Sequence, residues 1–187
     1  SLQLDQLVVH DIWAHLVDLH HIELKKNTRL IGILGHDVYQ DFEVFIDFQS
    51  KVIVLTRVDK KGIRIDTLAP YEVPYDSMEF ELRHHLIIVD TKVNNVRLKM
   101  ILDSGAELNL IDRQVNRKVM DKFTIIKRVN LLGVGNKEVE VLAGVMNEVQ
   151  CGNQFSEKMN TLLTSLDEIN QSFDVNVQGV LGYEFLK

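Results

Sequence analysis

An internal repeat constrains the fold of this chain more than any other feature of its sequence. Gly32-Ile-Leu-Gly-His-Asp-Val-Tyr39 resembles Gly179-Val-Leu-Gly-Tyr-Glu-Phe-Leu186, at an offset of 147 residues (179 − 32). The same offset aligns upstream apolar positions, namely Leu16, Leu19 and Ile22 with Leu163, Leu166 and Ile169. Each copy therefore predicts a short helix, an apolar turn with two glycines and the start of another helix. The alternative is a chance match of two glycine-containing turns, which the agreement of the upstream positions disfavours.

The domain organisation follows from this repeat and from the prolines. The chain has 187 residues, and its two prolines, Pro70 and Pro74, lie within four residues of each other. Proline fixes φ and removes a hydrogen-bond donor, so this stretch predicts an extended connector. We expect residues 1–66 to be the C-terminal part of a first copy and 67–78 to be the connector. Residues 79–187 would be a second copy that lacks the hairpin closing the first.

The periodicity of apolar residues predicts a mainly β chain. Residues 41–48 alternate charged and apolar side chains and precede a second apolar run at 51–57, which predicts a hairpin. Residues 86–93 and 96–102 flank Asn94-Asn95, a pair suited to a tight hairpin turn. Helices are expected to be few and short. Their predicted positions are 11–21 after Asp11, 113–119 after Asp112, and 166–169 after Ser165.

Composition narrows the class of protein. Hydrophobic residues make up 45% and charged residues 26%, which predicts a globular domain with a buried core. The net charge of −6 disfavours nucleic acid as a partner, because phosphate binding requires a basic surface. No apolar run is long enough for a membrane span, and the first residues do not resemble a signal peptide. Localisation therefore stays open.

One short segment carries a candidate catalytic group. Residues 100–111 place Asp103 in an Asp-Ser-Gly turn with apolar, strand-like residues on both sides. Such flanking residues predict a desolvated carboxylate, and Gly105 permits a tight turn. Asp-Ser-Gly by itself is also an ordinary turn sequence.

Three segments in order resemble a known family. Ile101-Leu-Asp-Ser-Gly-Ala-Glu-Leu-Asn-Leu-Ile111 resembles the Asp-Thr/Ser-Gly-Ala catalytic loop of retropepsin-like aspartic proteases. Gly179-Val-Leu-Gly-Tyr-Glu-Phe-Leu186 is similar to the turn and helix near the end of bacterial members, and Leu131-Leu-Gly-Val-Gly-Asn-Lys137 resembles the flap hairpin between them. The resemblance covers about residues 79–187, and residues 32–55 resemble the tail of a preceding copy.

This resemblance implies a fold, an activity and a site. The fold would be mainly β, a closed retropepsin-like barrel with a few short helices, and the activity that of an aspartic endopeptidase acting on peptides or proteins. Asp103 would be the catalytic carboxylate, Ser104 would brace the loop, and Gly105 would shape it. The residues expected to contact substrate are Ala106, Glu107, Gly133, Val134 and Gly135. No cofactor and no metal ion are implied.

The family's mechanism uses two aspartates, and this chain contains one such loop. The second aspartate would come either from a homodimer mate or from an upstream repeat of a longer protein. The alternative is a protein of the same fold that binds peptides or dimerises without hydrolysis.

Other reactive side chains have simpler interpretations. The histidines at 10, 15, 20 and 21 fit a solvated surface better than a metal site, and no Gly-x-Ser-x-Gly elbow suggests a serine hydrolase. Cys151 has no obvious histidine partner and is expected to be a buried structural thiol.

Overall fold

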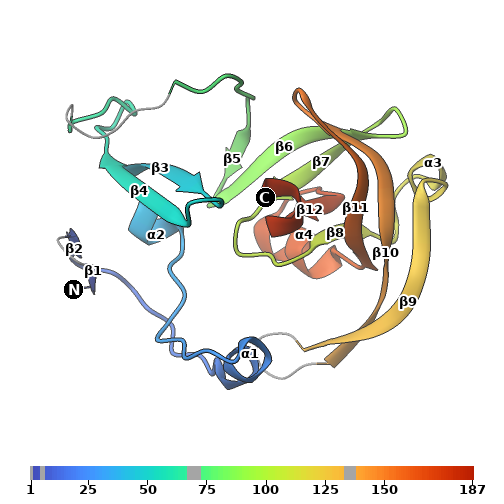
Figure 1. Ribbon diagram of the computed structural model, residues 1–187, viewed down its shortest axis with the longest axis horizontal. Coiled ribbons are helices and arrows are strands. Elements are labelled where there is room, and N and C mark those ends of the chain that lie inside the picture. Colours follow the sequence, from blue (N-terminus) through green and yellow to red (C-terminus); the bar gives the residue numbers. More distant parts are fainter. Residues whose placement is uncertain (1, 5–6, 67–72, 133–137) are drawn as a thin grey trace. The chain divides into compact units, whose positions relative to one another are not determined.

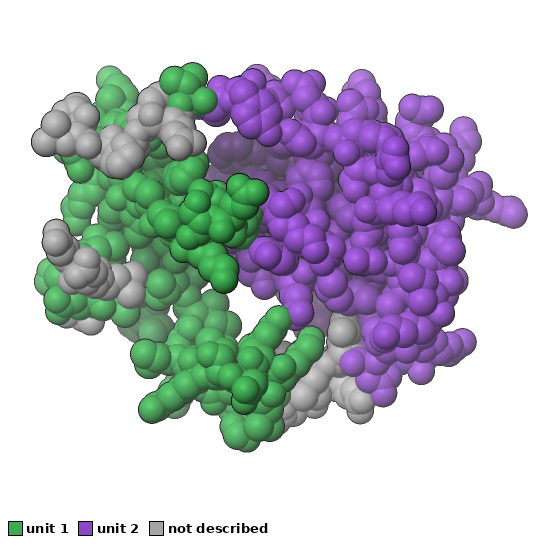
Figure 2. Space-filling model, viewed as in Figure 1, with its two compact units in different colours: residues 1–73, 132–137 green, residues 74–131, 138–187 purple. Residues whose placement is uncertain are grey.

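The computed structural model describes residues 2–4, 7–66, 73–132 and 138–187. The chain divides into two compact units, each described by itself below (Figure 2). Unit 1 comprises residues 1–73 and 132–137, and unit 2 comprises residues 74–131 and 138–187. Within the predicted connector, residues 67–72 lie outside the described part of the chain, and residues 73–78 form neither helix nor strand. In the described residues, no helix is long and apolar enough to cross a membrane.

The described residues of unit 1 form two antiparallel strand pairs and two short helices (Figure 1). Its elements are β1 (Leu2–Leu4), β2 (Leu7–Val9), α1 (His20–Lys26), α2 (His36–Tyr39), β3 (Phe42–Asp47) and β4 (Val52–Arg57). The pairs β1–β2 and β3–β4 are both antiparallel. The second pair confirms the hairpin predicted from the alternation at 41–48. The Asp47 carboxylate accepts hydrogen bonds from the backbone N–H groups of Gln49 and Ser50, which fixes the turn.

Unit 2 is built on one large sheet. Its strands are β5 (Glu81–Arg83), β6 (Leu86–Val93), β7 (Val96–Leu102), β8 (Asn109–Asp112), β9 (Phe123–Leu132), β10 (Glu138–Cys151), β11 (Gln154–Thr164) and β12 (Gly179–Leu181). Its helices are α3 (Arg117–Met120), α4 (Asp167–Phe173) and α5 (Tyr183–Leu186). The strand order is β5-β6-β7-β12-β8-β11-β10-β9, and β10 also pairs with β6. This extra pairing returns the sheet on itself, which agrees with the barrel expected from the sequence.

The core of unit 2 comes from the alternating side chains of these strands. The β6–β7 hairpin turns at Asn94 and Asn95, whose φ values of 48° and 60° are left-handed, as the sequence predicted. Alternate residues of the two strands are buried, among them Val89, Val93 and Met100. These side chains pack with buried residues of β8, β10, β11 and β12, namely Ile111, Met146, Val149, Met159 and Leu181. The hydrophobic core of unit 2 is therefore formed by side chains from β6, β7, β8, β10, β11 and β12.

Two of the three predicted helices differ from the structure. Residues 11–19 contain no helix, and α1 begins at His20, because Asp11 has a left-handed φ of 56° and no cap forms there. Asp112 ends β8, and its carboxylate accepts the N–H of Gln114, so the helix starts later, capped by the Asn116 side chain. The third helix, predicted at 166–169, is α4 and extends to Phe173.

The repeat seen in the sequence is present in local backbone geometry. At the offset of 147, α1 coincides with α4 and α2 with α5 at both ends. Asn27 and Asp174, which follow α1 and α4, are left-handed with φ of 47° and 48°. The β1–β2 pairing of Leu2 with Val9 also has its counterpart, Val149 with Ser156, in the β10–β11 pair.

A side-chain hydrogen bond is repeated as well. The Glu23 carboxylate accepts the backbone N–H of Leu30 at 2.7 Å. The side chain of Asn170 accepts the N–H of Val177 at 2.9 Å, and both residues are 147 positions further along. In each copy this bond ties the helix to the segment that leads into the glycine-containing turn. The two segments therefore share this bond at the same offset of 147 residues.

Candidate active site

The Asp103 loop leaves the sheet at the end of β7 and returns to it at the start of β8. The backbone N–H of Asp103 donates to the carbonyl of Leu181 in β12 at 2.9 Å. The carboxylate of Asp103 accepts the N–H of Gly105 at 2.8 Å, and the Asp103 carbonyl accepts the N–H of Ala106 at 3.2 Å. The loop is thus anchored to a core strand, and one oxygen of its carboxylate is held by the loop's own backbone.

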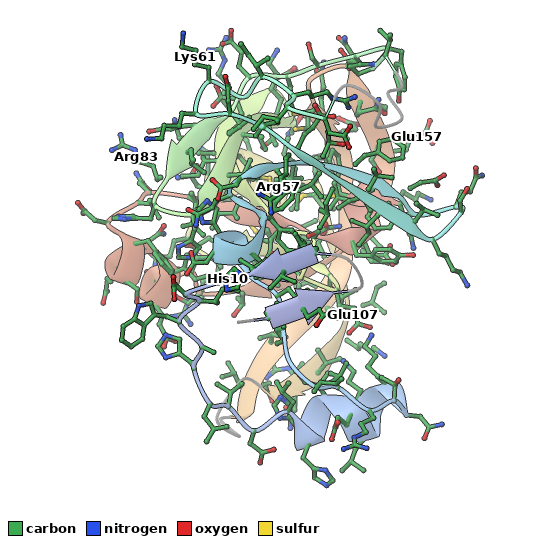
Figure 3. All side chains as sticks on the ribbon, turned by 90° about the vertical axis from the view of Figure 1, so that its left-hand side faces the viewer. His10, Arg57, Lys61, Arg83, Glu107 and Glu157 are labelled. Carbon is green, nitrogen blue, oxygen red and sulfur yellow. The ribbon has the colours of Figure 1, made fainter. Side chains whose placement is uncertain are left out.

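The side chains of this loop are more accessible than the sequence predicted. Asp103, Ser104, Gly105 and Glu107 are exposed, and Ala106 is half-buried. Glu107 is labelled in Figure 3. The expectation of a desolvated carboxylate is wrong for this chain, because Ile101 is buried in the core whereas Asp103, two residues further along, is exposed. Desolvation would require a second element to cover the loop.

The turn between β12 and α5 packs directly against the Asp103 loop. The N–H of Tyr183 donates to the carbonyl of Ala106 at 2.8 Å. A Cβ atom at Gly182 would lie 2.5 Å from that same carbonyl oxygen and 2.9 Å from the oxygen of Leu108. Only glycine permits this approach of two backbones. The structure therefore brings together two of the segments that carried the resemblance, residues 101–111 and residues 179–186.

Asn109 is a site residue that the sequence interpretation did not single out. It is fully buried, with 0% of its surface exposed. Its side-chain oxygen accepts the N–H of Gly182 at 2.8 Å, and its amide nitrogen donates to the carbonyl of Asn160 in β11 at 3.0 Å. The only sign of Asn109 in the sequence was a polar amide side chain at the start of an apolar, strand-like run. Asn109 joins the loop, the β12–α5 turn and β11.

The predicted flap residues Gly133, Val134 and Gly135 lie outside the described residues. The strands on either side of them, β9 and β10, are neighbours in the sheet. Their role in binding substrate stays a prediction.

Other candidate groups are not gathered into a site. In the described residues, no cluster of three or more His, Cys, Asp or Glu side chains is placed to hold a metal ion. Cys151 is fully buried, and burial raises the pKa of its thiol, with the nearby charge of Asp90 acting in the same direction. A hollow of about 480 Å³ is lined by Asp121, Lys122, Asn147, Glu148, Phe155 and Glu157, and includes none of the predicted site residues.

A comparison with known protein families covers the loop and turn just described. The sequence model of the family described as "Aspartyl protease" matches residues 89–185, more than half of the chain. The chain belongs to the aspartyl protease family. The match spans the Asp103 loop, Asn109 and the β12–α5 turn, so the family assignment and the geometry concern the same residues.

Among solved structures, the chain is similar to a retropepsin-like aspartic protease from Rickettsia conorii. The identity is 17% and the TM-score 0.40, over 57% of this chain and 74% of that one. No curated protein matches the sequence.

Proposed function

We propose that this aspartyl protease family member is an endopeptidase in which Asp103 is one carboxylate of a catalytic pair. The observation that carries the proposal is the construction of the loop. Asp103 is exposed, yet its backbone is fixed to β12 and its carboxylate is oriented by the N–H of Gly105. An accessible carboxylate held in one orientation is what general acid–base chemistry requires.

The second carboxylate would come from an equivalent loop facing the first. Two carboxylates about 3 Å apart cannot both be ionised, so such a pair shares one proton. The ionised member would remove a proton from a water molecule, whose oxygen attacks the peptide carbonyl carbon. The protonated member would donate to the carbonyl oxygen, which gives a tetrahedral diol. The proton taken from water would then pass to the amide nitrogen as the C–N bond breaks, and the amine would leave. Because the two groups titrate as a pair, activity would depend on pH through two apparent pKa values.

An extended peptide is the substrate class that fits the sheet. β9 stands at the end of the strand order, and Ile125 and Ile126 on it are 55% and 64% exposed. A substrate strand added beside the β9–β10 hairpin would gain main-chain hydrogen bonds and apolar contacts. The predicted flap, Gly133 to Gly135, would cover it.

The direct test is cleavage of an unfolded, carboxymethylated protein between pH 4 and 7. Both the 187-residue chain and a form extended upstream of Ser1 should be assayed over a range of protein concentration. Asp103→Asn should reduce cleavage to background without changing the unfolding transition, while Asp121→Asn, an exposed aspartate in unit 2, should cleave normally. Cleavage that survives Asp103→Asn, or no cleavage by either form, would contradict the proposal.

A non-catalytic peptide-binding or dimerisation module is the second candidate. It is favoured by the exposure of Asp103 and by the single Asp-Ser-Gly segment in the chain. Peptide binding that is unchanged in Asp103→Asn, with no cleavage by either form, would support it.

A further inference from the structure

Residues 75–78, here called the strap, lie along the turn that joins β10 to β11 in unit 2. The side chain of Gln154 donates to the Tyr75 hydroxyl at 3.3 Å. The side chain of Asn153 donates to the Asp76 carboxylate at 2.9 Å. Successive residues of the strap therefore contact successive residues of the turn. Because the strap belongs to no helix or strand, these side-chain contacts are what tie it to the sheet.

Met78 makes a further contact between the strap and the turn. Its sulfur accepts the S–H of Cys151 at 3.6 Å. A Cβ atom added at Gly152 would lie 3.3 Å from the methyl carbon of Met78, so this side chain rests directly on the turn. Gly152 has a left-handed φ of 56°, a conformation that favours glycine. The thioether of Met78 therefore lies on the turn, with 37% of the residue exposed to solvent.

Met78 is the most accessible methionine of the chain, whose five methionines all lie in the described residues. Met100, Met146 and Met159 are 1%, 1% and 4% exposed, and Met120 is half-buried. An oxidant in water reaches a sulfur only through an exposed surface. Oxidation of the folded protein should therefore start at Met78.

Cys151 is covered although its neighbours in the chain are not. It is 0% exposed, whereas Gln150 and Gly152 on either side of it are exposed. Burial raises the pKa of the Cys151 thiol, which keeps this group protonated and therefore a donor to Met78. A protonated and covered thiol reacts slowly. The Met78 side chain is thus in contact with the thiol whose access to solvent is blocked.

We propose that Met78 is a site of reversible oxidation by peroxide, and that its sulfoxide releases the strap and uncovers the Cys151 thiol. The sulfur lone pair attacks one oxygen of hydrogen peroxide and the O–O bond breaks. The departing hydroxide takes the proton of the transferred hydroxyl and leaves as water. The sulfur is oxidised by two electrons and the peroxide is reduced by two. Two thiols of a reductant reverse the step, becoming a disulfide as the oxygen leaves as water.

The sulfoxide weakens the contact that Met78 makes. Its sulfur carries a partial positive charge and no longer accepts the S–H of Cys151. Its oxygen is polar, so water solvates it better than the buried surroundings of the thiol do. The two remaining bonds, to Tyr75 and Asp76, join exposed side chains and contribute little net stability. Peptide hydrolysis takes no part in this step, so the inference stands apart from the proposed function.

The rate at which iodoacetamide alkylates the folded protein tests the proposal, because the chain has a single cysteine. Protein treated with dilute hydrogen peroxide, then freed of peroxide with catalase, is compared with untreated protein. Alkylation should become faster on the order of tenfold, the effect of one lost hydrogen bond on an opening equilibrium. Peptide mass spectrometry should place one added oxygen on Met78. Oxidation of the Cys151 thiol before Met78 gains oxygen would contradict the proposal.

Substitutions of Met78 separate this effect from general damage by peroxide. Met78→Leu keeps an apolar contact without a sulfur, so its Cys151 should react slowly before and after peroxide. Met78→Gln introduces a polar group of similar length and should react fast without peroxide. Met120→Leu is the matched control and should respond to peroxide as the unmodified protein does.

Two results would overturn the proposal. Faster alkylation of Met78→Leu after peroxide would show that another group is the one whose oxidation uncovers the thiol. Slow alkylation of Met78→Gln would show that the side chain at this position does not control access to Cys151.

Discussion

Asn109 shows how much of the candidate site depends on one buried side chain. Its amide bonds two backbone groups that are far apart in sequence, the N–H of Gly182 and the carbonyl of Asn160. Buried polar groups without partners are costly, so removing this side chain leaves both backbone groups unsatisfied. Asn109 touches no reacting group. It is a positioning residue that acts through the loop and the turn on either side of it.

We expect Asn109→Ala to lower the free energy of unfolding by about 2–3 kcal/mol, because the N–H of Gly182 and the carbonyl of Asn160 lose their partner. Urea unfolding followed by circular dichroism measures the change. Asn130→Ala, at an exposed position in β9, is the control and should stay within about 0.5 kcal/mol of the unmodified protein. Equal stabilities of the two variants would show that the bonds of Asn109 are replaced by water.

At the scale of elements, the two hairpins at 41–57 and 86–102 were predictable, whereas two of the three helices were not. Asn94-Asn95 and the alternation of 41–48 are local signals, and local chemistry decides a tight turn. The helix expected at 11–21 does not form over residues 11–19, where Asp11 has a left-handed φ of 56°, and α1 begins only at His20. A segment with apolar residues suited to a strand can show an accidental helical spacing when it is read alone.

The bond that ties α4 to the β12 segment gives a prediction at this scale. Asn170→Ala removes the acceptor for the N–H of Val177 and should lower the free energy of unfolding by about 1–2 kcal/mol. Asn170→Glu should lose less, because Glu23 serves as the acceptor in the first copy. Gln171→Ala, exposed on the same helix, is the control for helix propensity. If Asn170→Glu is as unstable as Asn170→Ala, the two bonds are not equivalent.

At the scale of the whole molecule, the two units differ in how completely they bury their apolar side chains. Unit 2 buries its β12 segment, whereas in unit 1 the equivalent Ile33 and Leu34 are exposed, as is Trp13 at 91%. Where the chain passes from unit 1 to unit 2, Val73 and Tyr75 are 79% and 94% exposed and form neither helix nor strand. Unit 2 should therefore be the more stable of the two.

Limited digestion with chymotrypsin tests this difference. We expect cleavage after Tyr75 and a fragment beginning at Asp76 that persists while unit 1 is degraded, because exposed irregular segments are cut first. Mass spectrometry of the time course identifies the fragment. Tyr75→Ser should remove that particular fragment. Loss of unit 2 at the same rate as unit 1 would contradict the expected difference in stability.

The sequence by itself determined the parts that depend on near neighbours. These are the mainly β character, the hairpins at 41–57 and 86–102, the sequence repeat with its offset of 147, and the segment containing Asp103. Each depends on turn chemistry or on a periodicity that a short window contains.

Only the tertiary structure decided which of these parts are buried together. It showed that Asp103 is exposed, that Asn109 joins the loop to the β12–α5 turn, and that one copy of the glycine-containing turn is core while the other is uncovered. The physical reason is that burial depends on strands brought together from distant positions. The same local sequence is therefore a core strand beside β7 and β8, and an exposed segment where unit 1 provides no such neighbours.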